Sequence, residues 1–369
     1  MRKTCGFSVQ SFILTATLFA GLGFIDHAAA QERSYLIDLN SRTVTQLGDL
    51  GGGFTKAYGL NDSGQVAGSS NNSAGTQRAF ITGPDGVGMT DLGTPSANSR
   101  SEAYGINNAG QVVGYSVTPE GAPRAFMTGP GGMGIRDLFG GYAQDINEAG
   151  QVVGATGDAF HAFITGPNGI GVKDLGYLEG NQSAAFGVND RGEVVGWTPV
   201  SGNSHAFITD PGGANMRDLG TLGGSFSHAN GINGAGEVVG FSSKDDSGQG
   251  AFAFITGPGG VGMRDLGTLG RNFSVANDIN EAGQVVGFSA TPIDGLDHAF
   301  ITNPDGTGMI DLNSLVDVPG GAILTQAMDI NNMGQVIALG IPEPESFVML
   351  LAGLGLIGFI VHGKRQVIV

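Results

Sequence analysis

A ten-residue segment recurs seven times along the chain, and this repeat limits the folds that the chain can adopt. Its clearest copy, at residues 231–240, reads Gly-Ile-Asn-Gly-Ala-Gly-Glu-Val-Val-Gly. Every copy has an asparagine followed three residues later by a glycine. These pairs are Asn61 and Gly64, Asn107 and Gly110, Asn147 and Gly150, Asn189 and Gly192, Asn233 and Gly236, Asn280 and Gly283, and Asn331 and Gly334. Successive asparagines are 46, 40, 42, 44, 47 and 51 residues apart, and a period in this range indicates a repeat architecture.

Each repeat predicts four short β-strands. In one copy they span residues 229–233, 237–242, 251–256 and 263–266, which are rich in Val, Ile and Phe and are bounded by turn residues. The paired valines suit strands that are covered on both faces. The Asn-x-x-Gly sequence predicts a hairpin, because the asparagine side chain can bond the backbone two residues on and the glycine can adopt a positive φ. Seven separate ligand sites are the alternative interpretation.

The count of strands predicts an all-β, seven-bladed β-propeller with four-stranded blades. Six units are complete. Residues 35–37 and 44–48 resemble the third and fourth strands of a unit, and the last copy, around Asn331, supplies only a first and a second strand. The two half-blades together predict a seventh blade that closes the ring. An open β-solenoid is the alternative architecture.

The third strand of three units begins with His-Ala-Phe, at His161, His205 and His298. With these triplets the units resemble the bacterial HAF repeat over roughly residues 33–340. The resemblance implies an extracellular repeat protein, and it carries no catalytic residues to this chain. We therefore expect residues 31–340 to form the propeller.

The first 30 residues predict a secretory signal peptide. Arg2 and Lys3 precede an apolar run at residues 12–25, and the small residues Ala28 and Ala30 place cleavage before Gln31. A retained membrane anchor is the alternative. The only cysteine is Cys5, so the mature chain would have no disulfide, cysteine-bound zinc or thiol nucleophile.

Residues 341–369 form a three-part C-terminal segment. Pro342, Glu343 and Pro344 precede an uncharged run at residues 347–361, and Lys364 and Arg365 follow. The run would span about 22 Å as a helix, which is short for a bilayer core of about 30 Å. The segment resembles the PEP-CTERM sorting signal. This resemblance implies transient anchoring in the inner membrane, cleavage by an exosortase-type membrane protease, and delivery to the outer surface or extracellular matrix of a Gram-negative bacterium. An anchor that is never cut is the alternative.

Charge and residue spacing identify no catalytic, cofactor-binding or metal site. The net charge of −16 argues against nucleic-acid binding, which depends on neutralising phosphates. The repeated histidines and the aspartates of the Asp-Leu pairs occur once per unit on outer strands, whereas glycoside chemistry needs two neighbouring carboxylates. The alternative is a Ca²⁺ site in an acidic, glycine-rich turn, for which the sequence has no specific motif.

The loops suggest which face of a propeller would bind a ligand. Turns between the first and second and between the third and fourth strands are nearly constant, whereas the other connections vary and are free to serve recognition. The residues in or beside the variable connections are Arg100, Tyr115, Trp197, His228 and Arg271. We hypothesise that this face binds sugars by aromatic stacking, with His228 in a solvent-facing loop. Ordinary rim residues are the alternative.

The sequence therefore predicts an exported, non-enzymatic binding or structural module of the cell surface or exopolysaccharide matrix. The alternatives are a passive matrix component and a secreted polysaccharide lyase or hydrolase. The enzyme would need carboxylates or basic groups that converge at the channel, and the repeat pattern identifies none.

Overall fold

The computed structural model describes residues 32–95, 100–157, 160–245 and 250–342. Within these ranges the regular structure is β-strand, apart from short 3₁₀ turns such as Pro84–Gly86 and Pro130–Gly132. This confirms the all-β prediction. The signal-peptide residues Ala28, Ala30 and Gln31 lie outside the described residues, as do Glu343, Pro344, Lys364, Arg365 and the apolar run. Over the described residues, no helix has the length and apolar character needed to cross a membrane.

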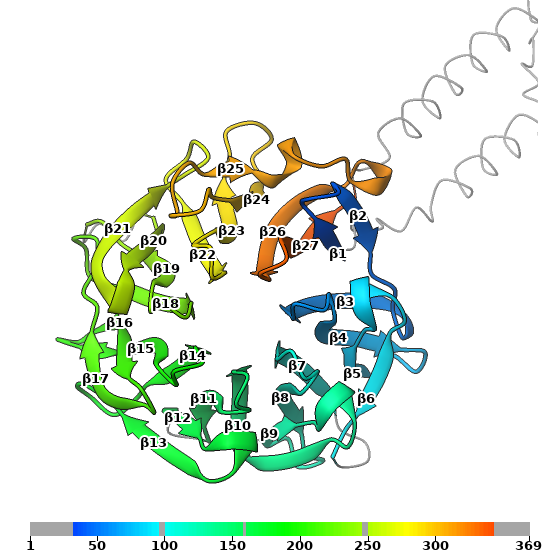
Figure 1. Ribbon diagram of the computed structural model, residues 1–369, viewed down its shortest axis with the longest axis horizontal. Helices are drawn as coiled ribbons and strands as arrows, with labels where there is room; N and C mark the ends of the chain where they lie inside the picture. Colours follow the sequence, from blue (N-terminus) through cyan, green and yellow to red (C-terminus); the bar gives the residue numbers. More distant parts are fainter. Residues whose placement is uncertain (1–31, 96–99, 158–159, 246–249, 343–369) are drawn as a thin grey trace, which may run out of the picture. The chain divides into compact units, whose positions relative to one another are not determined.

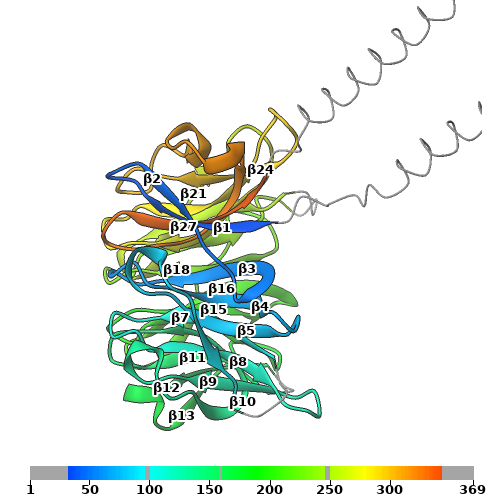
Figure 2. The same cartoon turned by 90° about the vertical axis from the view of Figure 1, so that its right-hand side faces the viewer.

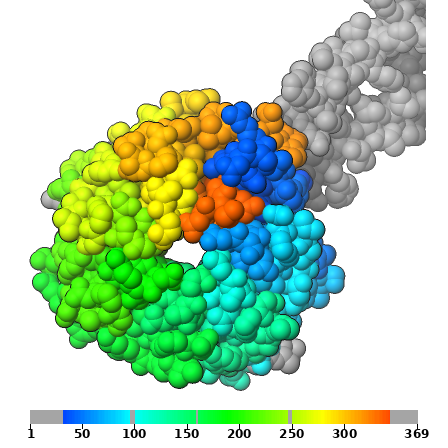
Figure 3. Space-filling view, in the orientation of Figure 1, coloured from blue at the N-terminus to red at the C-terminus, as the bar shows by residue number. Residues whose placement is uncertain are grey.

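The strands form six hydrogen-bonded sheets around a central opening (Figures 1 and 3). The first sheet, from the channel outwards, contains β3 (Gly51–Leu60), β4 (Val66–Asn72), β5 (Gln77–Ile81) and β6 (Thr90–Gly93). The second contains β7 (Ser101–Ile106), β8 (Val112–Val117), β9 (Pro123–Met127), β10 (Arg136–Ile146), β11 (Val152–Thr156), β12 (His161–Thr165) and β13 (Val172–Gly176).

The remaining four sheets have four strands each, and the first strand of each is the innermost. The third sheet contains β14 (Ala184–Val188), β15 (Val194–Val200), β16 (Asn203–Asp210) and β17 (Ala214–Asp218). The fourth contains β18 (Ser227–Ile232), β19 (Val238–Ser242), β20 (Phe252–Gly257) and β21 (Val261–Gly267). The fifth contains β22 (Ser274–Ile279), β23 (Val285–Ala290), β24 (Asp297–Ile301) and β25 (Ile310–Asp311). The sixth contains β26 (Ile323–Ile330), β27 (Gln335–Ile341), β1 (Arg33–Asp38) and β2 (Thr43–Gln46).

The second sheet has seven strands because β10 serves two repeat units. Residues Arg136 to Gly140 pair with β9, and residues Gly141 to Ile146 pair with β11. One continuous strand thus replaces the loop that joins the fourth strand of a unit to the first strand of the next. The same region has the shortest spacing of the repeat, 40 residues between Asn107 and Asn147.

The sixth sheet combines strands from opposite ends of the described chain. β1 pairs antiparallel with β27, from Arg33 opposite Gly340 to Asp38 opposite Gln335. Figures 1 and 2 both show the two strands side by side. Tyr35 in β1 is fully buried, at the position where the other units have the phenylalanine of their Ala-Phe pair, so this pairing also completes the packing of the sheet.

Each sheet is covered on both faces, as the paired valines predicted. Val238 packs with residues of the third sheet, including Val195, whereas its neighbour Val239 packs with residues of the fifth sheet, including Val285. All four side chains have no exposed surface. Successive side chains of a strand point to opposite faces, so a Val-Val pair fills the space between sheets on both sides.

The predicted Asn-x-x-Gly hairpin is confirmed. In the copy at Asn233 the side-chain oxygen accepts bonds from the backbone N–H groups of Ala235 (3.1 Å) and Glu237 (3.0 Å), and Gly236 has a φ of +78°. The side-chain Nδ2 also donates to the carbonyl oxygen of the equivalent asparagine in the next unit. These bonds, 2.9 to 3.3 Å long, run from Asn61 to Asn107, Asn107 to Asn147, Asn147 to Asn189, Asn189 to Asn233, Asn233 to Asn280, Asn280 to Asn331, and Asn331 to Asn61.

Two faces of this ring of sheets are distinguished by their connections. The glycine-rich 3₁₀ turns contact the hairpins, for example through the N–H of Gly86, which donates to the carbonyl oxygen of Gly64 at 3.0 Å. Both kinds of turn therefore lie on one side, which we call the hairpin face. The connections that follow the second and fourth strands lie on the opposite side, which we call the loop face.

Candidate functional site

A cavity of about 290 Å³ occupies the centre of the ring, lined by the innermost strand of every unit. Two adjacent repeat positions form most of its wall. The first holds Tyr58, Tyr104, Gln144, Phe186, Asn230, Asn277 and Met328, and the second holds Gly105, Asp145, Gly187, Gly231, Asp278 and Asp329. The cavity thus combines aromatic, amide and carboxyl groups.

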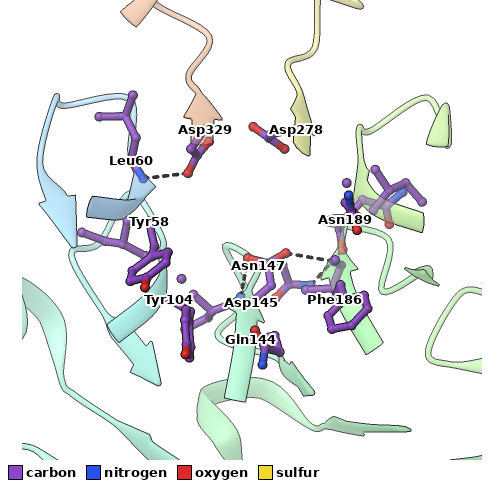
Figure 4. A pocket seen from close by; sticks show the side chains of 18 of the residues that line it. Tyr58, Leu60, Tyr104, Gln144, Asp145, Asn147, Phe186, Asn189, Asp278 and Asp329 are labelled. Carbon is purple, nitrogen blue, oxygen red and sulfur yellow. Dashed lines mark hydrogen bonds between the residues drawn. The ribbon is translucent and has the colours of Figure 1, made fainter. Parts of the chain in front are cut away.

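Three carboxyl groups converge on the cavity, and each bridges to the neighbouring sheet. Asp145 Oδ2 accepts from the backbone N–H of Val188 at 2.9 Å. In the same way, Asp278 Oδ2 accepts from Ile330 N–H at 3.1 Å, and Asp329 Oδ2 accepts from Leu60 N–H at 2.8 Å. Figure 4 shows Asp278 and Asp329 close together, with Asp145 on the other side of the cavity.

A bulge in the innermost strand aims these side chains across the sheet interface. The register shifts between Ala143 and Asp145, and equivalent shifts precede Asp278 and Asp329. A bulge of this kind re-aims a side chain. Units with glycine at the position have less room, because a Cβ at Gly59 would lie 2.6 Å from the carbonyl oxygen of Tyr104.

The surroundings of the three carboxyl groups favour their protonated forms. Burial raises the pKa of Asp145 to about 7, although two backbone N–H bonds oppose the shift. Burial also raises the pKa of Asp278 and raises that of Asp329 well above its usual range. The charge of Asp278 also contributes to the raised pKa of Asp329, because two closely spaced carboxyl groups disfavour each other's ionised form.

This carboxyl cluster was missed in the sequence, although a signal for it exists. The residue two places before the repeated asparagine is aspartate in three units and glycine in four. Equivalent positions on innermost strands face one channel, so aspartates far apart in the chain, such as Asp145 and Asp329, meet there. The repeat pattern had identified no converging carboxyl groups, and the structure places three at the channel.

The raised pKa of Asp145 predicts a pH-dependent difference in stability between the protein and Asp145→Asn. The folded state binds the proton of Asp145 more tightly than the unfolded state does. The carboxyl group therefore contributes most to the unfolding free energy below about pH 4, and this contribution is lost as the pH rises to about 7. Relative to the variant, the unchanged protein should lose unfolding free energy on the order of a few kcal/mol over this range. Urea unfolding at several pH values measures the difference. A constant difference would contradict the assignment.

An aromatic pocket of about 300 Å³ adjoins the channel on the loop face. Its wall contains Tyr104, Tyr142, Phe160, Phe186 and Trp197, and it shares Tyr104, Gln144 and Phe186 with the central cavity. Trp197 pairs with Ala184, the first residue of β14, and Phe160 lies in the connection between β11 and β12. The pocket therefore spans several units near the loop-face end of the channel.

The aromatic side chains around this pocket contact one another in a row. The ring centroids of Tyr58 and Tyr104 are 4.9 Å apart, and those of Tyr115 and Tyr142 are also 4.9 Å apart. Tyr142 is stacked with Phe160 at 6.2 Å. Phe160 keeps 43% of its surface exposed. Contacts with neighbouring rings restrict the motion of each ring, so the row forms a preorganised apolar surface.

The five predicted binding residues have different environments. Trp197 lines the aromatic pocket, whereas Tyr115 is buried in β8 and donates its hydroxyl hydrogen bond to Glu102 at 2.9 Å. Arg100 and Arg271 are exposed in connections of the loop face. The structure brings Trp197 and His228 together, with ring centroids 5.7 Å apart.

The expectation of a solvent-facing His228 was wrong. His228 lies in β18, stacked between Trp197 and Phe241, and its Nε2 is 2.8 Å from the hydroxyl oxygen of Ser204. Burial lowers its pKa, so the ring is neutral near pH 7. Half-buried His228 lies between the buried residues Ser227 and Ala229 of β18, in the alternating pattern of a strand. The loop before the hairpin is therefore shorter than expected.

The repeated His and Asp residues make cross-strand pairs away from the channel. His161 Nδ1 is 2.9 Å from Asp174, His205 Nδ1 is 2.9 Å from Asp218, and His298 Nδ1 is 2.7 Å from Asp311. Each pair joins the third strand of a unit to its fourth. Among the residues that the structure describes, no group of three or more His, Cys, Asp or Glu side chains is placed to hold a metal ion.

Comparison with known proteins identifies one sequence motif. The PEP-CTERM protein-sorting motif matches residues 340–366, and this signal indicates an exported protein that undergoes membrane-associated sorting. A search of curated proteins found no match.

Several solved structures share the fold. The β-propeller domain of the Trilobed protease from Pyrococcus furiosus has a TM-score of 0.54 and 9% identity, with 79% of this chain and 91% of that chain covered. Oligogalacturonate lyase from Vibrio parahaemolyticus has a TM-score of 0.51 and 11% identity, with 86% and 98% covered. A puromycin-hydrolyzing peptidase of Mycobacterium tuberculosis has a TM-score of 0.52 and 12% identity, with 76% and 49% covered.

At these identities the likenesses show the fold alone. The sheets around a channel and the sorting motif together define an exported all-β protein with a propeller-like fold.

Proposed function

We propose that this chain is an exported, non-enzymatic repeat protein that binds saccharides of the cell surface or exopolysaccharide matrix through its loop face. The observation that carries the proposal is the aromatic pocket beside the channel, lined by Tyr104, Tyr142, Phe160, Phe186 and Trp197. Concave sites with apolar walls and a few polar groups are typical of small-molecule binding. Aromatic faces offer the apolar surface on which sugar rings stack, and Gln144 supplies an amide within the same wall.

The fold of this module is proposed to be a closed ring of seven HAF-type blades with four strands each. The pairing of β1 with β27 and the bond from Asn331 to the carbonyl oxygen of Asn61 support it, because both join the last repeat to the first part of the chain. The double use of β10 accounts for six hydrogen-bonded sheets with seven repeats. A rigid ring would hold aromatic residues from distant units in one pocket.

The channel favours a neutral saccharide over an anionic one. Asp145, Asp278 and Asp329 line the cavity that shares a wall with the aromatic pocket, and the whole chain has a net charge of −16. A uronate carboxylate would be repelled by the negative net charge of the chain, whereas sugar hydroxyl groups can hydrogen-bond to protonated carboxyl groups and to amide groups.

Trp197→Ala and Phe160→Ala should each weaken saccharide binding about tenfold, because a lost stacking partner removes on the order of 1 kcal/mol or more. Binding is measured with the producer's purified exopolysaccharide and with matched neutral and uronate oligosaccharides. Tyr177→Ala is the control, since Tyr177 is 45% exposed in the connection between β13 and β14 and lies outside the pocket.

Unchanged affinity in both pocket variants, with unchanged unfolding curves, would rule out the aromatic pocket. No binding by the unchanged protein to any of the saccharides would rule out the function and favour a passive matrix component.

An enzyme of polysaccharide cleavage is the second candidate. The supporting observation is Asp145, whose pKa of about 7 would let one carboxyl donate or accept a proton near neutral pH. Release of reducing ends or unsaturated ends in the same incubations, lost in Asp145→Asn, would favour a hydrolase or a lyase over a binding module.

Sorting is proposed to follow the steps that PEP-CTERM motifs generally undergo. Residues 1–30 direct export, the C-terminal segment anchors the chain transiently in the inner membrane, and an exosortase-type protease removes that segment. The motif match at residues 340–366 supports these steps. The mature protein would then reach the outer surface or the matrix.

A further inference from the structure

The chain leaves the ring of sheets on the face that carries the aromatic pocket. The hairpin at Asn331 and Gly334 joins β26 to β27 on the hairpin face, so the other end of β27, at Ile341, lies on the loop face. The pairing of Arg33 with Gly340 places the start of β1 at the same edge. Phe160 and Trp197 belong to this face as well.

The sorting motif begins within the last strand of the sheet. Its match starts at residue 340, within β27, and only residues 342–346 separate that strand from the uncharged run at 347–361. Five residues reach at most about 17 Å when fully extended.

The exit point also lies inside the ring and not at its rim. β27 is the second strand from the channel, between β26 and β1. The tether of about 17 Å is attached near the middle of the loop face. With the apolar run held in a membrane, the loop face could turn only slightly away from that membrane.

We propose that the loop face lies against the lipid bilayer for as long as the C-terminal segment remains in the membrane. In this state the aromatic pocket is closed to polysaccharide chains, and removal of the segment opens it. The orientation follows from the exit of β27 and the tether length, and only its consequence for saccharides rests on the proposed function. Membrane-bound and released forms thus differ in which surface they expose.

Cysteine labelling tests the orientation in the full-length chain. Cys5 is the only natural cysteine and is replaced by serine in every variant. Ile293→Cys places a thiol in the connection between β23 and β24 on the loop face, where Ile293 is 79% exposed. Val87→Cys is its matched control on the hairpin face, where Val87 is 65% exposed beside the turn Pro84–Gly86.

Spheroplasts of a strain that lacks the sorting protease are treated with a bulky polyethylene-glycol maleimide. We expect Ile293→Cys to react at least about tenfold more slowly than Val87→Cys, which corresponds to about 1.4 kcal/mol of protection. Detergent should make the two rates similar. Insertion of about 30 Gly and Ser residues after Ile341, which adds roughly 30 Å of flexible reach, should do the same. Equal rates with the native tether would overturn the proposal.

Polysaccharide pull-down on the same cells separates the orientation from the function. The lengthened tether should restore binding of the long exopolysaccharide chain. If labelling is asymmetric but neither the lengthened nor the released form binds saccharide, the orientation stands and the proposed function fails. If the released form binds and the native-tether form binds equally well, occlusion of the pocket is wrong.

Discussion

Gly114→Ala is expected to destabilise the protein by about 3 kcal/mol or more, because the new methyl group would overlap backbone atoms that cannot move independently. A Cβ at this position in β8 would lie 1.9 Å from the carbonyl oxygen of Glu102 and 2.8 Å from the Cα of Ala103. The same close approach occurs at the equivalent glycines of five other units, Gly68, Gly154, Gly196, Gly240 and Gly287. The change in unfolding midpoint in urea measures the effect.

Gly48→Ala is the matched control for this substitution. A Cβ at Gly48 would meet no atom within 4 Å, and its φ is not in the left-handed region. We expect its unfolding free energy to change by less than about 1 kcal/mol. Equal losses of unfolding free energy in the two variants would show that steric overlap at Gly114 is not the cause of the destabilisation.

Asn331→Ala is expected to cost about 2–3 kcal/mol of unfolding free energy, because it leaves buried backbone groups without partners. Its Oδ1 accepts from the N–H groups of Met333 (3.0 Å) and Gln335 (2.8 Å), and its Nδ2 donates to the carbonyl oxygen of Asn61 at 2.9 Å. The side chain therefore stabilises a hairpin and also joins the last repeat to the first.

Asn72→Ala separates these two contributions. Asn72 Oδ1 accepts from Ala74 N–H and Thr76 N–H, both at 3.0 Å, in the same local pattern, but on the loop face and more exposed to solvent. Loss of this turn should cost less than about 1 kcal/mol. If denaturation in urea gives the same loss for both variants, the bond between repeats contributes nothing measurable.

Much of the fold could be predicted because its rules are local and repeated. Asn233 and Gly236 specify a hairpin within four residues, and Val238 with Val239 shows that both faces of the strand are covered. The same residues recur in every unit because each unit packs against its neighbours in the same way, and this recurrence makes the pattern easier to recognise. The double role of β10 could not be predicted in the same way, because it depends on which partner each half of one long strand finds.

The candidate site was harder to predict because it depends on distance in space. Trp197 was identified as an aromatic residue near a variable connection, but its neighbours in the pocket, such as Tyr104 and Phe160, come from other units. Tyr115 and His228 were placed in the right region, but their burial depends on packing against Glu102 and Phe241. The three channel aspartates required knowing that one repeat position faces the channel in every unit.

The innermost strands break the symmetry that the repeats create. Seven equivalent positions around an axis would offer a ligand seven equivalent ways to bind. Aspartate at only three of them, and aromatic rings at only Tyr58, Tyr104 and Phe186 of the neighbouring position, leave one side of the channel unlike the others. The wall of the channel is therefore chemically asymmetric, although the strands that form it repeat one backbone pattern.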